Sequence, residues 1–317
     1  MSHTSIVIPR DGSIGLGAAD EPALVFRDRT GNVTRRVSVP DVIELHGLTL
    51  VEEDGEQRIW IADTAEKLYG GQPELYIQAS LPGKVLQIDL NGNVLRRLAN
   101  PDVAAYTETP YAPSGVVVDE QRFGGSGDIW VADGYGASLV HRYDAAGNYV
   151  STLDGTKGAG RFQEPHDLLI DRRGAEPLLY VADRVHGRIQ VFDLTGTFVR
   201  VVGEGDLGGP TQMAVSGEYL IVTDLLRGRL SIFDGNDRLV THQFEHSSAP
   251  QSWGDLARWE AQGWPNALSA EGIVAPVHFE PEAFHTPHGI AVAPDGTVFV
   301  CEFALQGRVA VLDPTRC

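Results

Sequence analysis

The chain has 317 residues, of which 43 are acidic and 25 are lysine or arginine, for a formal net charge of −18. This charge argues against nucleic acid or an anionic membrane surface as a partner. Residues 1–15 lack the apolar core of a signal peptide, and no segment reaches the ~20 apolar residues that a membrane-spanning helix needs. The two cysteines, Cys301 and Cys317, do not form a disulfide framework. We therefore expect a cytoplasmic protein that folds as a single domain over residues 1–317.

The N-terminal part of the chain contains three strand-like runs before any clear repeat. They cover residues 5–8, 23–28 and 32–37, and the last two resemble the outer half of the repeat that follows. We expect these strands to supply most of a blade and so to complete the last blade of a ring. The short C-terminus, which ends just after Asp313, is expected to lend a closing strand, because such closure hides sheet edges.

From residue 46 onward, the chain repeats one unit five times. Each copy contains three or four short alternating or β-branched runs separated by Gly, Asp and Asn turns, a pattern typical of short antiparallel strands. The run that is easiest to align covers residues 59–63, 129–133, 179–183, 220–224 and 298–302. The period of about 40 to 55 residues is that of four-stranded propeller blades, which stack because one blade cannot bury both of its faces. With the N-terminal strands, the sequence predicts an all-β, six-bladed β-propeller, in preference to five blades.

Two insertions interrupt the repeat. Residues 244–286, between copies four and five, include a short predicted helix over residues 253–262. This insertion leads directly to the fifth copy, so it either walls a substrate pocket or forms a surface excursion packed by its tryptophans. The second insertion, residues 67–82 within copy one, has no assigned role.

Three histidines open alternate copies of the repeat. His46, His166 and His288 are 120 and 122 residues apart and belong to copies one, three and five, whereas copies two and four have Ser114 and Thr211 at this position. Alternate blades of a six-bladed ring lie a third of a turn apart, so the three imidazoles are predicted to converge on the central axis. Such a trio can bind a metal ion and leave an open position for water or substrate, as catalytic zinc sites do.

The seven other histidines show no such spacing. A single histidine after proline in a repeat of this kind is more often an ordinary loop or core residue than a ligand. His278 and His285 lie near the third candidate, but Pro287, His288 and Gly289 match the repeat better. The remaining five are interpreted as surface or structural residues.

Several motifs resemble those of known propeller families. The Val-Ala-Asp and Gly-Arg-Ile-x-Val-Phe-Asp segments resemble NHL repeats, which build six-bladed propellers, over nearly the whole chain. Within that group, the chain resembles the peptidyl-α-hydroxyglycine α-amidating lyases. The matching segments are residues 46–48, 131–135, 162–166, 181–192, 287–288 and 295–299.

This resemblance implies a zinc ion held by His46, His166 and His288, with Tyr135 and Arg184 completing the site. It implies cleavage of the C–N bond of an α-hydroxyamide, a carbinolamide, to an amide and an aldehyde such as glyoxylate. Tyr135 would take the hydroxyl proton and return it to nitrogen, and Arg184 would orient a substrate carboxylate or stabilise negative charge. Without the resemblance, Tyr135 would be interpreted as an aromatic residue of a turn, and Arg184 as a cation on the surface of a blade.

Other positions depart from the family pattern. Arg10 is the candidate for the second active-site arginine of the family and for substrate binding, although the N-terminal region is shorter here. Gly136 replaces a disulfide cysteine, Thr286 replaces a methionine, and Gly289 replaces an aspartate that binds structural calcium. The resemblance therefore does not carry calcium over to this position, although backbone carbonyls such as that of Leu48 remain available to bind an ion. Because no monooxygenase domain accompanies this part, a small α-hydroxyamide or related carbinol is the expected substrate.

Two other functions fit a propeller. A metal-dependent hydrolase of the lactonase type would use carboxylate and asparagine ligands, as oxygen-rich calcium sites do, whereas three histidines favour zinc or another divalent transition metal. A non-catalytic NHL scaffold that binds proteins would need neither metal nor spaced histidines. The sequence does not predict the oligomeric state.

Overall fold

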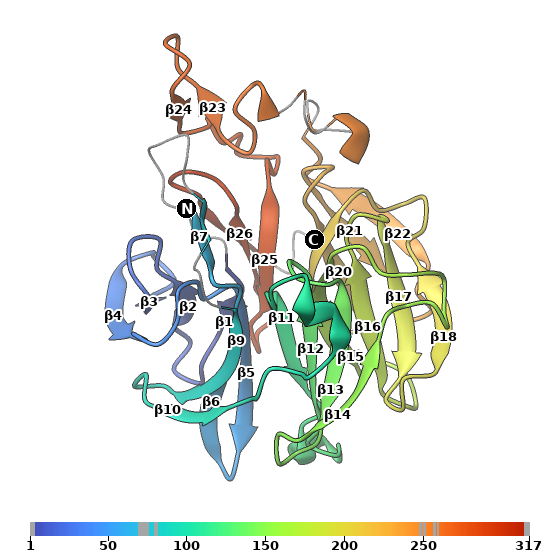
Figure 1. Cartoon of the computed structure of the whole chain (residues 1–317). Helices are drawn as coiled ribbons and strands as arrows, with labels where there is room; N and C mark the ends of the chain where they lie inside the picture. The colour runs from blue at the N-terminus through green and yellow to red at the C-terminus, as the bar shows by residue number, and fades with distance from the viewer. Residues whose placement is uncertain are drawn as a thin grey trace.

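The fold is known from a computed structural model, which describes residues 4–68, 76–78, 82–246, 249, 252–255, 258 and 260–313. Its six main sheets form a ring, so the predicted all-β, six-bladed β-propeller is confirmed (Figure 1). The innermost strands contact one another in the order β1, β5, β11, β15, β19 and β25, and β25 contacts β1 again. Within the described residues, no helix is long and apolar enough to cross a membrane.

The first three blades are antiparallel four-stranded sheets. Blade 1 consists of β1 (Ile6–Val7), β2 (Ile14–Gly17), β3 (Ala23–Arg27) and β4 (Val33–Ser38). Blade 2 consists of β5 (Gly47–Glu53), β6 (Glu56–Asp63), β9 (Lys84–Asp89) and β10 (Val94–Arg97). Blade 3 consists of β11 (Gly115–Val118), β12 (Ile129–Asp133), β13 (Leu139–Tyr143) and β14 (Tyr149–Leu153).

The next two blades also have four strands, and blade 6 has three within the described residues. Blade 4 consists of β15 (Pro165–Asp171), β16 (Leu178–Asp183), β17 (Arg188–Asp193) and β18 (Phe198–Val202). Blade 5 consists of β19 (Pro210–Ser216), β20 (Tyr219–Asp224), β21 (Arg229–Phe233) and β22 (Leu239–Gln243). Blade 6 consists of β25 (Pro287–Val292), β26 (Val298–Glu302) and β27 (Val309–Leu312).

The ring closes in a different way from the one expected. The N-terminal strands form a complete blade by themselves, and β27 pairs with β26 of blade 6 instead of joining blade 1. The additional N-terminal strand is β2, whose Ile-Gly-Leu-Gly sequence carries too few large side chains to be recognised. Gly15 is required there, because a Cβ atom would lie 2.7 Å from Val7 Cγ2 and 2.9 Å from Phe26 Cε1.

The hydrophobic core is divided among the interfaces between neighbouring blades. Each blade is buried on both faces, which explains the runs of large apolar residues in the second strands, such as Trp60 and Trp130. Blades 6 and 1 share the cluster that closes the ring, made of Ile6, Ile14, Leu16, Ala293, Phe299 and Cys301. Cys301 is fully buried there.

The long insertion lies at one end of the ring (Figure 1). It contains the 3-10 turn η3 (Trp253–Asp255) and a small ribbon of β23 (Ala267–Leu268) and β24 (Val274–Ala275). The helix predicted over residues 253–262 is described only in part, because residues 256, 257 and 259 lie outside the described residues. The second insertion contains a ribbon of β7 (Glu66–Leu68) and β8 (Tyr76–Gln78), and its other residues up to 81 also lie outside them.

Candidate metal centre

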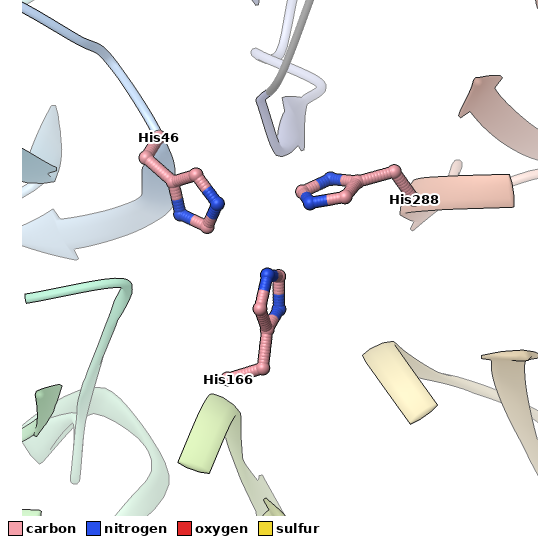
Figure 2. A group of neighbouring side chains, drawn as sticks. All are labelled: His46, His166 and His288. Carbon is pink, nitrogen blue, oxygen red and sulfur yellow. The ribbon is translucent and has the colours of Figure 1, made fainter. Parts of the chain in front are cut away.

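The three spaced histidines meet at the centre of the ring. His46 directly precedes β5, while His166 and His288 are the second residues of β15 and β25. Each side chain is buried, and Figure 2 shows the three rings pointing toward one another. The ring centroids are 4.9 to 5.2 Å apart, and one nitrogen of each ring lies within 4.8 Å of the others. Six-blade geometry therefore converts the sequence spacing into a compact cluster.

Backbone carbonyls of the neighbouring blades orient the imidazoles. His46 Nδ1 lies 2.7 Å from the carbonyl oxygen of Ser114, and His166 Nδ1 lies 2.8 Å from that of Thr211. The backbone of Thr4 interacts with His288 and acts against burial on the pKa of that imidazole. Because a carbonyl only accepts, Nδ1 carries the proton and Nε2 of His46 and His166 presents a lone pair.

Hydroxyl side chains occupy the same axial position in the alternate blades. Thr4 Oγ1 donates to the carbonyl of Leu45 at 2.7 Å, directly before His46. Ser114 and Thr211 donate in the same way to the prolines that precede the other two histidines, at 3.1 and 3.2 Å. The axis is thus lined alternately by imidazoles and hydroxyls, and each hydroxyl fixes the backbone at the next histidine.

A buried carboxylate in each of blades 2 to 6 holds the segment that leads to the axis. Asp63, at the end of β6, accepts hydrogen bonds from the backbone N–H groups of Ile43 and Glu44, both at 3.0 Å. Equivalent bonds join Asp133 to Ala112, Asp183 to Gln163, Asp224 to Gly209 and Glu302 to Thr286. The acidic residue that ends each Val-Ala-Asp-like run therefore positions the axial residue of its own blade.

Burial keeps the imidazoles of His46 and His288 neutral. Desolvation lowers the pKa of His46 to about 4, and the charge of Arg184 lowers it further, against the hydrogen bond to Ser114. Desolvation likewise lowers the pKa of His288 well below its usual value, helped by His46 and Arg184. Neutral imidazoles are the form that binds metals. Three such nitrogens fit zinc or another borderline transition metal better than calcium, which prefers oxygen ligands.

Tyr135 and Arg184 lie beside this cluster. Tyr135 comes two residues after the end of β12, and its hydroxyl is 3.0 Å from His166 Nε2 and 3.5 Å from His46 Nε2. Arg184 directly follows β16, and its Nη1 donates to the Tyr135 hydroxyl at 3.2 Å. The structure thus brings five of the six predicted site residues together.

Arg10, the sixth, lies elsewhere, so the sequence-based assignment to this site was wrong. Its guanidinium forms an ion pair with Glu52 at 2.5 Å and donates to the carbonyl of Gly55. These partners lie at the end of β5 and in the turn after it, whereas His46 precedes the start of that strand. The N–H group of Ser5 donates to the carbonyl of His46. Strand β1 then leads along the axis away from this point, so residue 10 lies beyond the histidine cluster.

Two residues of this site were missed in the sequence. Glu164 Oε2 accepts hydrogen bonds from Arg184 Nε at 3.0 Å and Nη2 at 2.5 Å. Trp253, from the long insertion, lies with its ring centroid 5.6 Å from the Arg184 guanidinium carbon, and its indole N–H donates to the carbonyl of Gly208. Glu164 could have been found in the sequence, because it directly precedes Pro165 and the predicted ligand His166. Trp253 shows that the insertion reaches the site.

The departures from the lyase pattern have local causes. Gly289 packs against the carbonyl of Thr4, and a Cβ atom there would be too close to it. Thr286 is buried, and its hydroxyl donates to the carbonyl of Phe303 at 2.7 Å. The Phe303 ring lies 6.0 Å from that of His288.

Comparison with known proteins gives partial sequence matches. No family model matches the chain. The peptidyl-glycine alpha-amidating monooxygenases A and B of Xenopus laevis are each 29% identical to it over 195 residues, which cover 59% of this chain. The matched regions make up 18% and 19% of those proteins, so the chain spans less than a fifth of the length of these relatives.

Solved structures with the same architecture include a streptogramin B lyase, with a TM-score of 0.57 and 12% identity over 98% of this chain and 93% of that one. A virginiamycin B lyase from Staphylococcus aureus gives a TM-score of 0.55 and 12% identity over 98% of this chain and 95% of its own. At this identity, the likeness supports the fold alone.

Proposed function

We propose that this protein is a metal-dependent carbon–nitrogen lyase that cleaves an α-hydroxyamide to an amide and an aldehyde such as glyoxylate. The observation that carries the proposal is the Tyr135 hydroxyl, 3.0 Å from His166 Nε2 beside three buried imidazoles. The partial similarity to the amidating monooxygenases, together with the resemblance of this chain's motifs to those of the amidating lyases, supports the same reaction class. The fold alone does not indicate a reaction.

The donor set fits a divalent transition metal, and zinc is the ion we propose. Bound by His46, His166 and His288, zinc would supply a Lewis acid that lowers the pKa of a substrate hydroxyl. The carbonyl partners of the imidazoles hold the rings in place for this role. Structural calcium is not part of the proposal.

The chain's own residues would move one proton. Tyr135 takes the proton of the substrate hydroxyl as the carbon–oxygen double bond forms and the C–N bond breaks, and returns it to the departing amide nitrogen. No oxidant or reductant is needed, because one substrate gives one amide and one aldehyde. Arg184, which donates to the Tyr135 hydroxyl, stabilises the phenolate form while the proton is absent.

The partners we propose are small molecules, an α-hydroxyamide or a related carbinol. The net charge of −18 opposes binding to nucleic acid or an anionic membrane. A cytoplasmic location is proposed as well, since Cys301 is a buried free thiol.

The proposal is tested by incubating the zinc-loaded protein with a panel of α-hydroxyamides and measuring the aldehyde and the amide that are released. Equal amounts of both products, dependent on enzyme and metal, are expected. Lactones in the same panel test the hydrolase alternative. Hydrolysis of a lactone without cleavage of any α-hydroxyamide would reject the lyase, and inertness toward both classes would favour a non-catalytic scaffold.

A further inference from the structure

Glu164 occupies a backbone conformation that few non-glycine residues adopt. Its φ angle is +54°, in the left-handed region. Its N–H group donates to Ser138 Oγ at 3.2 Å, and its carbonyl accepts from the N–H of Arg184 at 3.2 Å. Strained residues of this kind persist where the surrounding structure fixes them, frequently at ligand sites.

The carboxylate of Glu164 occupies one of the two edges by which Arg184 can bind a carboxylate. Nε and Nη2 form this edge, and both donate to Oε2 of Glu164. The third contact, from Nη1, goes to the Tyr135 hydroxyl. The guanidinium also lies over the rings of Tyr135 and Trp253, 5.2 and 5.6 Å from their centroids. The chain's own groups thus hold this cation.

Arg184 is also the cation whose charge acts on His46 and His288. A substrate carboxylate at the reacting carbon would therefore meet Arg184 already paired, with Glu164 beside it. Placing like charges together at a binding site costs affinity and is a recognised means of rejecting the wrong ligand. The Glu164 side chain is 35% exposed, so the protein shields only part of this charge.

We infer that Glu164 is a specificity-determining residue, which directs the site to neutral or cationic carbinolamides and against those with a carboxylate on the reacting carbon. This inference rests on the proposed lyase function and narrows its substrate class. Glyoxylate-releasing substrates become the poorer members of that class, and neutral aldehydes the preferred products.

The test compares two substrates that differ only in charge, N-benzoyl-α-hydroxyglycine and its primary amide. Both release benzamide, so one assay gives kcat/KM for each. We expect the wild-type protein to favour the neutral substrate by roughly tenfold or more, mainly through KM, and Glu164→Gln to reduce that preference by roughly tenfold. A wild-type preference for the anionic substrate, or an unchanged ratio in the variant, would overturn the inference.

Glu204→Gln is the matched control. Glu204 also lies near an arginine, 3.6 Å from Arg188, but its side chain is 69% exposed and away from the cluster. This variant should keep the wild-type substrate ratio. A ratio that shifts as much as in Glu164→Gln would show a general charge effect and count against the assigned role.

Calorimetry can measure the binding of hippurate and hippuramide to the zinc-loaded wild-type protein. Because neither compound has the α-hydroxyl group, this measurement reports charge specificity separately from catalysis. Tighter binding of hippuramide is expected, whether or not the protein turns over a substrate. Tighter binding of hippurate would refute the charge preference even if Glu164→Gln failed to fold. Preferential hippuramide binding without any turnover would reject the lyase and leave the charge preference standing.

Discussion

At the scale of single residues, the site depends on an alternation around the ring. Imidazoles and hydroxyls take turns at the position that begins each innermost strand. The imidazole protons of His46 and His166 are held by carbonyls of the next blade, and each hydroxyl fixes the residue before the next histidine. The protein backbone therefore orients the ligands before any metal binds, a form of preorganisation that metal sites generally require.

Tyr135→Phe tests the proposed proton carrier. The variant keeps the aromatic ring and all three imidazoles but has no acidic proton, so metal content should stay unchanged and kcat should fall by about 10² to 10⁴-fold. Benzamide release and metal analysis of the same preparation provide the two readings. Tyr149→Phe, at a tyrosine whose hydroxyl bonds Thr152 away from the cluster, should retain wild-type kcat. Full turnover by Tyr135→Phe would remove Tyr135 from the mechanism.

The sequence predicted which histidines form the cluster, but it did not predict the side chains that contact the residues around it. His46, His166 and His288 follow from spacing, because the repeat gives them equivalent places in a symmetric ring. Glu164 is different, since its bond to Arg184 depends on a left-handed backbone angle and on two side-chain rotamers that no repeat specifies. Thr4 was missed because the first blade lacks the proline that marks this position in the other intervening blades.

At the scale of the blade, the regular strands follow directly from composition. Alternating and β-branched runs predicted most strands of blades 2 to 6, since each sits between two neighbours and is buried on both faces. β2 escaped prediction because its glycines are needed for close packing against Val7 and Phe26, and glycine weakens the strand signal. The insertion has no repeat to guide prediction, and its contact with Arg184 depends on tertiary packing.

Blade 3 contains a buried histidine that makes stability depend on pH. His141 bonds the Tyr106 hydroxyl at 2.6 Å and Thr152 Oγ1 at 2.8 Å, and desolvation lowers its pKa to about 4. A histidine with a lowered folded-state pKa contributes stability that is present above its unfolded pKa and is lost as pH falls toward 4. Because of His141, the unfolding free energy should therefore decrease by about 2 kcal/mol when the pH is lowered from 7.5 to 5.

His141→Gln isolates this contribution, because the other histidines titrate in both proteins. Urea unfolding at pH 7.5 and pH 5 should show a decrease in unfolding free energy that is about 2 kcal/mol smaller in the variant than in the wild type. The same decrease in both proteins would mean that His141 is protonated in the folded state at pH 5, contrary to its buried environment.

At the scale of the whole molecule, the ring is held closed by packing between blades 6 and 1. β1 lies against β25 and β5, and Ile6 joins the cluster that blade 6 shares. Val7 packs on the other side, against blade 2. The histidine spacing predicted six blades, because only a six-bladed ring places alternate copies a third of a turn apart. The mode of closure was not predictable, since both termini offer short apolar runs that fit either blade.

The double variant Ile6→Ala/Val7→Ala tests this closure. Both side chains are buried, at 5% and 2% exposure, and fully burying such a side chain contributes about 1.5 to 3 kcal/mol. The unfolding free energy from chemical denaturation should fall by about 3 to 6 kcal/mol. Val33→Ala, at a residue that is 52% exposed on β4, should change it by less than about 0.5 kcal/mol. Equal effects of the two changes would contradict closure through β1.

The central claim is that the three axial histidines form a metal site, and metal analysis of the purified protein tests it most directly. The account predicts about one divalent transition metal per chain in the wild type, and almost none in His166→Ala measured after the same incubation with zinc and removal of excess ion. His186→Ala, which removes a histidine bonded to Asp183 outside the cluster, should bind as the wild type does. A wild-type protein that binds no transition metal, or a His166→Ala protein that still binds one, would contradict the account.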